Sequence, residues 1–186
     1  MVSVMSLWLP IIVSAVIVFV ASSVMHMVLR YHSNDFRKVP KEDEVLDALR
    51  KINIPPGDYA MPHAGSTADM KRPEFIEKMK AGPIVFMTVA PGGSPSMASS
   101  LVMWFLYSIV AGVFAAYIAG RALGPGARFL DVFRFAGCTA FAAYSLALLQ
   151  NSIWYRRNWG TTAKSVFDGL VYALLMGGTF GWLWPR

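Results

Sequence analysis

Four long apolar stretches separated by polar segments dominate the pattern of the chain. The first, residues 8–29, contains no charged side chain and can cross the roughly 30 Å hydrocarbon core of a bilayer. The others are residues 98–120, 131–155 and 165–184. We therefore predict an all-α integral membrane protein with four transmembrane helices in a bundle. Its parts are a first helix within residues 1–30, a loop over 31–97, and three helices within 98–186.

Local signals refine the ends of two of these helices. Pro10 suits a first helical turn, so the first span is expected to begin near it. A cleaved signal peptide is the alternative, but the start lacks Lys and Arg and the apolar run is too long. Ser165 and Asp168 match a capping box, which predicts that the last helix begins at Ser165.

The loop over residues 31–97 has a different, polar pattern. Apolar residues at Val45, Leu46, Leu49 and Ile52 predict a short amphipathic helix after Pro40. Prolines and glycine in residues 54–63 end it, and residues 73–81 predict a second short helix. Residues 84–89 are apolar and β-branched, which fits either a strand or a segment on the membrane surface. The two short helices are expected to pack on the membrane or on a partner.

Composition supports a membrane protein. Hydrophobic residues make up 55% of the chain and charged residues 15%, where a soluble domain carries about 25%. The net charge of +6 does not indicate nucleic-acid binding, because the basic residues interrupt apolar spans. Cys138 is the single cysteine, which excludes an internal disulfide and a cysteine-based zinc site.

The basic residues also predict an orientation. All 17 Lys and Arg residues lie in the long loop or after the third span, except Arg121, Arg128, Arg134 and Arg186. Basic residues favour the cytoplasmic side. We expect the long loop in the cytoplasm and both termini outside.

Small residues recur at every fourth position of two spans and predict close helix packing. They are Gly112, Ala116 and Gly120 in the second span, and Gly169, Ala173, Gly177 and Gly181 in the fourth. We expect that one such face exceeds what the bundle itself needs and is available to a partner.

Polar residues inside the spans define a candidate site, because such residues are rare in lipid without a reason. His26, Gln150, Asn151 and Asp168 fall at one depth below the predicted cytoplasmic surface, and Tyr107 can reach the same layer. One interpretation is a proton or solute site, or a histidine ligand to a cofactor. The other is hydrogen bonding between helices, with Asp168 as a helix cap.

Metal and haem patterns are absent from the sequence. His26 and His32 are six residues apart, which places them on different faces of a continuous helix. His63 lies in the loop, so only His26 lies within a span. We therefore expect no metal and no cofactor.

Two stretches, residues 150–155 and 168–185, resemble a family of bacterial inner-membrane proteins with four spans. The resemblance implies a bacterial inner-membrane location. No activity accompanies it, so no functional residue is transferred.

The sequence leaves three hypotheses for function. The first is a non-catalytic accessory subunit that packs against itself or a larger membrane complex, because small-residue faces are present and reactive motifs are not. The second is a small solute or proton carrier, or a channel subunit, that uses the polar layer. The third, a membrane enzyme acting on a lipid or quinone, ranks lowest because no nucleophile or paired carboxylates can be named.

Overall fold

The computed structural model describes residues 1–93 and 96–186, and the chain forms two compact units. The first, Met1–Phe36 with Ser96–Arg186, is a helical bundle. The second, Arg37–Pro95, is a small unit inserted between the first and second long helices. Each is described by itself.

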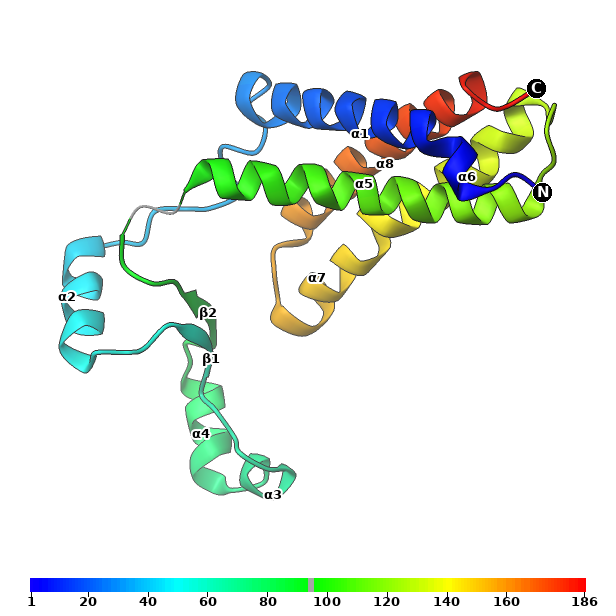
Figure 1. The fold of residues 1–186 in the computed structure, drawn as a ribbon. Coiled ribbons are helices and arrows are strands. Elements are labelled where there is room, and N and C mark those ends of the chain that lie inside the picture. The colour runs from blue at the N-terminus through cyan, green and yellow to red at the C-terminus, as the bar shows by residue number, and fades with distance from the viewer. Residues whose placement is uncertain (94–95) are drawn as a thin grey trace. The chain divides into compact units, whose positions relative to one another are not determined.

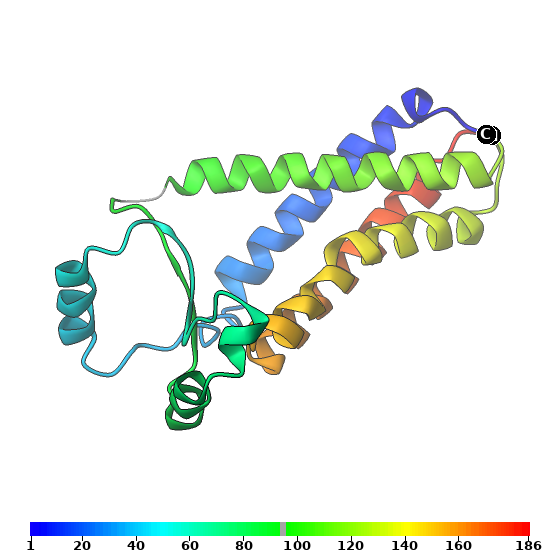
Figure 2. The same cartoon turned by 90° about the horizontal axis from the view of Figure 1, so that it is seen from below.

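The bundle consists of four long helices whose neighbours form a closed ring in the order α1, α5, α6, α8. They are α1 (Trp8–Ser23), α5 (Met97–Ala122), α6 (Phe129–Tyr144) and α8 (Trp159–Trp182). Figures 1 and 2 show that α1 crosses α5 obliquely and that the two termini lie at one end of the bundle. Backbone hydrogen bonds from Val2 N to Gly120 O and from Gly126 N to Pro185 O tie that end together.

Three helical segments are long and apolar enough to cross a membrane, namely Val4–Val28, Met97–Ala122 and Phe129–Tyr155. The first comprises α1 with a 3-10 turn before it and a π-helical turn after it. Pro10 is the third residue of α1 rather than its start. There its missing N–H is one of the four that have no partner within the helix. The helix α8 has sufficient length but is not among these three segments, and it contains Lys164 and Asp168.

The predicted start of the last helix at Ser165 is wrong. The side chain of Asn158 caps α8, since its Oδ1 accepts hydrogen bonds from the backbone of Gly160 and Thr161. Ser165 lies within the helix and donates to the carbonyl of Thr161. The amide oxygen of Asn158 satisfies the free N–H groups of the first turn, so the helix begins six residues earlier.

The predicted third helix is interrupted. After α6 the chain bends at the buried Ser145 and passes through a 3-10 turn, Leu146–Leu148, into the short α7 (Leu149–Tyr155). Ser145 Oγ donates a hydrogen bond to the carbonyl of Val166 on α8. Gly169 lies against the same bend, where a Cβ atom would meet Ser145 Oγ. At this bend α8 packs close to the end of α6, because Gly169 has no side chain there.

The predicted small-residue faces pack inside the bundle. Gly112 lies against the backbone of Ile11, and Gly120 lies against the carbonyl of Val2. On α8, a Cβ atom at Gly177 would be 2.9 Å from the carbonyl oxygen of Phe133 and 3.1 Å from the Cα of Gly137. The faces of α5 and α8 are thus used by α1 and α6.

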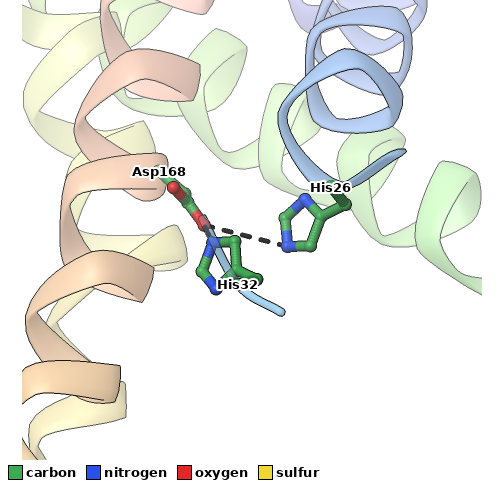
Figure 3. Close-up of side chains that lie close together, drawn as sticks. All are labelled: His26, His32 and Asp168. Carbon is green, nitrogen blue, oxygen red and sulfur yellow. Dashed lines mark hydrogen bonds and ion pairs between the residues drawn. The ribbon is translucent and has the colours of Figure 1, made fainter. Parts of the chain in front are cut away.

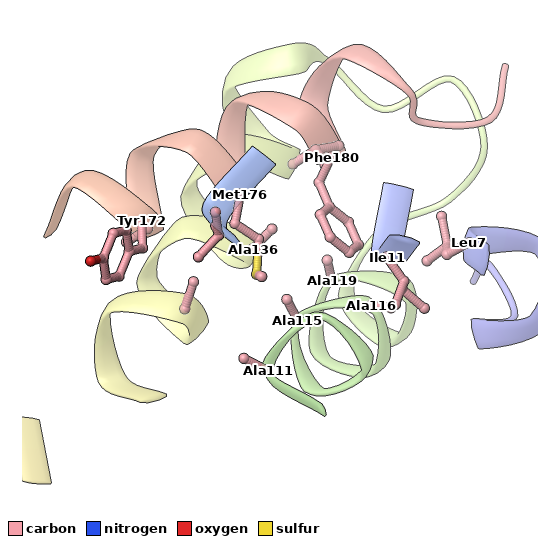
Figure 4. Close-up of a cluster of buried hydrophobic side chains, with 14 of the residues drawn as sticks. Leu7, Ile11, Ala111, Ala115, Ala116, Ala119, Ala136, Tyr172, Met176 and Phe180 are labelled. Carbon is pink, nitrogen blue, oxygen red and sulfur yellow. The ribbon is translucent and has the colours of Figure 1, made fainter. Parts of the chain in front are cut away.

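Larger side chains lie against a second set of small residues on α5, which are Ala111, Ala115 and Ala119. Figure 4 shows the ring of Phe180 directed toward the alanine face of α5, which includes Ala115 and Ala119. Leu7 and Met176 are also fully buried in this core. Small residues that let helix backbones approach closely are typical of helices packed in lipid.

The inserted unit combines helices with a small sheet. Its helices are α2 (Glu42–Ile52), α3 (Thr67–Met70) and α4 (Pro73–Ala81). The strands β1 (Gly57–Met61) and β2 (Val85–Val89) pair antiparallel, with Gly57 opposite Val89 and Met61 opposite Val85. Residues 85–89 are therefore a strand, and the all-α description is incomplete for this unit. The partner strand, β1, lies within residues 54–63, where the prolines and the glycine predicted only the end of a helix.

Gly177 and Gly178 offer a direct test of the α6–α8 contact. Gly177→Ala is expected to lower the free energy of unfolding by about 1–3 kcal/mol, because the new methyl group overlaps the α6 backbone. A methyl group added at Gly178 would meet no atom of another described element within 4 Å. Gly178→Ala should therefore leave stability unchanged or raise it slightly. Thermal unfolding of both variants in detergent measures the difference, and equal stabilities would contradict this packing.

Candidate functional site

The chain turns back on itself directly after the first membrane-spanning helix. The helix ends at Val28, and Arg30 adopts a left-handed backbone conformation with φ of 51°. Two turn hydrogen bonds follow, from Ser33 N to Arg30 O and from Asp35 N to His32 O. We call residues 29–36 the strap. The reversal places His32 beside His26, which lies in the last turn of the helix.

The prediction that His26 and His32 lie apart is therefore wrong. It assumed a continuous helix, and the helix stops between them. Their rings stack with centroids 4.6 Å apart and an angle of 3° between planes. Both rings face Asp168 of α8, and Figure 3 shows the three side chains together. His32 Nε2 lies 2.8 Å from Asp168 Oδ2, and His26 Nε2 lies 3.8 Å from the same oxygen.

Three further side chains complete what we call the polar cluster, which consists of His26, Tyr31, His32, Asp35, Lys164 and Asp168. The hydroxyl of Tyr31 donates a hydrogen bond to Asp168 Oδ1. His32 Nδ1 lies 2.6 Å from Asp35 Oδ2. Lys164 Nζ donates to Asp35 Oδ1 at 2.9 Å and to the backbone carbonyl of Tyr31 at 2.6 Å. These contacts fasten the strap to α8.

The cluster lies partly inside the protein and partly at its surface. The side chain of Asp168 is 5% exposed and that of His32 is 13% exposed. His26 is 50% exposed, so one side of the cluster is open. Burial alone would raise the pKa of Asp35, but hydrogen bonds from His32 and Lys164 outweigh it and lower that pKa. Burial, together with the nearby Asp168 carboxylate, raises the pKa of the Tyr31 hydroxyl, which stays protonated and donates.

The structure brings together two of the five predicted site residues, His26 and Asp168. Asp168 is the tenth residue of α8, so it does not cap that helix. Tyr107 belongs instead to an aromatic group with Trp104, Tyr144 and Tyr172, and its hydroxyl donates to the carbonyl of Ala143. Gln150 and Asn151 lie on α7, where Gln150 is exposed.

Sequence reasoning missed Tyr31, His32, Asp35 and Lys164 as site residues. Tyr31, His32 and Asp35 were assigned to the loop, and Lys164 was counted only as a basic residue at the membrane border. One local signal was present, since His32 and Asp35 have the three-residue spacing at which a turn can join two side chains. Their partners on α8 lie more than 120 residues further along the chain.

Comparisons with known proteins identify no relative: no family model, curated protein or solved structure matches the chain. The polar cluster must therefore be interpreted from its own chemistry. Two imidazoles and one carboxylate each bring one possible ligand atom within 4.8 Å of the others. This arrangement can hold a proton or a metal ion.

Lys164 is expected to hold the strap in place, which Lys164→Met tests. The variant leaves the carboxylate of Asp35, 8% exposed, without its lysine partner. A buried charge that loses its partner is destabilising. We expect faster hydrogen exchange at the amides of Ser33 and Asp35, measured by mass spectrometry. Lys38→Met removes an exposed lysine just beyond the strap and is the control. Equal exchange in both variants would show that Lys164 does not anchor the strap.

Proposed function

We propose that the chain is an integral membrane protein that binds a small cation in the polar cluster, as a carrier or a carrier subunit would. The observation that carries the proposal is the short distance between His32 Nε2 and Asp168 Oδ2, with His32 Nδ1 already engaged by Asp35. Both nitrogens of one imidazole face carboxylate oxygens.

The hydrogen-bond inventory calls for a positive charge between His32 and Asp168. A neutral histidine has one N–H donor and one acceptor nitrogen. His26 Nδ1 lies 3.0 Å from the carbonyl of Ser22, which can only accept, so this nitrogen carries the hydrogen. His32 Nδ1 likewise faces Asp35. His32 Nε2 lies 2.8 Å from Asp168 Oδ2, too close for two lone pairs to face each other, so a hydrogen or another cation must lie between them. The Nε2 of His26, 3.8 Å from the same oxygen, is free to present its lone pair there.

The charges of the cluster lead to the same conclusion. Asp35 and Asp168 are two carboxylates, and Lys164 is the lysine that contacts Asp35. With neutral histidines the cluster has one negative charge in excess. Asp168 is nearly buried, and an uncompensated buried charge costs several kcal/mol. A bound cation supplies the missing charge.

The position of the cluster suits uptake at the membrane border. It lies where α1 ends and α8 begins, at the opposite end of these helices from the termini. The half-exposed His26 provides access. The small-residue faces, in contrast, are occupied within the chain, so they give no support to the accessory-subunit hypothesis.

We further propose that α8 is a fourth span and that the membrane is a bacterial inner membrane. The support for four spans is that α8 packs along α1 and α6 and that both termini lie at one end. An even number of crossings produces this arrangement. The distribution of Lys and Arg favours a cytoplasmic inserted unit.

Reporter fusions test this topology. Alkaline phosphatase, which is active only outside the cytoplasm, is expected to be active when fused after Arg186 and inactive when fused after Lys80. A green fluorescent protein at the same two positions should give the opposite result. Reporters that place the two positions on the same side would exclude four spans.

Thermal unfolding of the purified chain in detergent tests cation binding. The panel contains Na⁺, K⁺, Mg²⁺, Ca²⁺, Mn²⁺, Co²⁺ and Zn²⁺ chlorides. A cation at 100 times its dissociation constant is expected to stabilise the protein by about 2.7 kcal/mol.

Asp168→Asn should abolish this stabilisation. Asp131→Asn, at the far end of the bundle, should retain it. If no cation stabilises the protein, or if Asp168→Asn responds like the unmodified chain, the proposal is wrong.

A further inference from the structure

We infer that the cation is a divalent first-row transition metal ion of the zinc type, bound by His26 Nε2, His32 Nε2 and the carboxylate of Asp168. The inference rests on the proposed cation site and specifies its ligand. It contradicts the expectation from the sequence that no metal is bound, because that expectation assumed separated histidines.

The donor atoms select the class of metal. Two imidazole nitrogens and one carboxylate suit Zn²⁺, Co²⁺, Fe²⁺ or Mn²⁺. Mg²⁺ and Ca²⁺ prefer sets of oxygen ligands only. Soft ions such as Cu⁺ prefer thiolates, and Cys138, the single cysteine, is exposed on α6.

The spacing of the donors fits one small ion. Zinc bonds of about 2.0–2.1 Å place neighbouring ligands of a tetrahedral ion about 3.3–3.4 Å apart. The distances from Asp168 Oδ2 to His32 Nε2, 2.8 Å, and to His26 Nε2, 3.8 Å, lie on either side of that spacing. Reaching it requires a shift of about half an ångström at each histidine. The half-exposed His26 ring must also turn out of its parallel stack on His32, because the lone pair of a ring nitrogen lies in the ring plane.

A surrounding set of hydrogen bonds already orients each ligand. Metal-binding histidines typically donate their second ring nitrogen to a carbonyl or a carboxylate. His26 has the carbonyl of Ser22 in that position, and His32 has Asp35. Lys164 in turn holds Asp35, and Tyr31 holds the second oxygen of Asp168. The stack on His32 fixes the plane of the His26 ring, and the carbonyl of Ser22 fixes which nitrogen faces Asp168.

Three protein ligands leave a fourth position open. A closed structural zinc site usually has four protein ligands, whereas an open position admits water or an exchanging group. The exposed side of His26 provides that opening. The site is therefore suited to a metal that enters and leaves at the membrane border, which agrees with a carrier.

Binding of Co²⁺ and Zn²⁺ to the purified full-length chain tests the inference. After treatment with a chelator and dialysis, Co²⁺ is titrated while its visible absorption is recorded, and Zn²⁺ is then added in competition. We expect one equivalent of Co²⁺ with strong bands typical of low coordination, displaced by one equivalent of Zn²⁺.

Variants assign the ligands. His26→Ala and His32→Ala should each weaken binding by more than 100-fold, and Asp35→Asn by about 10- to 100-fold with the stoichiometry unchanged. His63→Ala, which removes the histidine of the inserted unit, is the matched control and should bind normally. Because His26 is half exposed, His26→Ala is expected to fold, which its unfolding temperature without metal verifies.

The outcomes separate the two proposals. If Mg²⁺ or Ca²⁺ stabilises the chain through Asp168 while Co²⁺ and Zn²⁺ do not bind, the cation site stands and the transition-metal assignment is overturned. Undiminished Co²⁺ binding in both His26→Ala and His32→Ala also overturns it. If no cation binds at all, both proposals fail.

Discussion

The buried carboxylate of Asp168 is the constraint on which the polar end of the bundle depends. It lies inside α8, and a charge in that position must be compensated by neighbouring groups. The compensation comes from the strap, which supplies Tyr31 and His32 to the two oxygens. The reversal of the chain after α1 thus has an energetic reason, since it brings donors to a carboxylate that α8 alone leaves without partners.

The other end of the bundle is organised by a different force. Between α6 and α8 the glycines at positions 137 and 177 allow the two backbones to touch, and Phe180 of α8 is directed toward the alanine face of α5. Contacts of this kind depend on shape and dispersion, which operate in lipid as well as in water. The bundle therefore has a tightly packed apolar body and one chemically distinct polar end.

Our proposal places the chemistry of the protein at this polar end. The cluster has orienting hydrogen bonds, an exposed side and, with neutral histidines, one negative charge in excess, and the proposed cation site rests on these properties. The small-residue faces of α5 and α8, which suggested an accessory role, pack against other helices of the same bundle. Our proposal therefore rests on the polar cluster and not on the packing faces.

The sequence by itself determined the apolar helices, their small-residue faces and the polar character of the inserted segment, because helix periodicity and hydropathy are local properties. It also indicated His26 and Asp168, since polar residues within apolar stretches are conspicuous. Only the tertiary structure decided that His32, Asp35 and Lys164 join them. Their meeting depends on where α1 ends and on contacts between residues more than 120 positions apart, which no local pattern records.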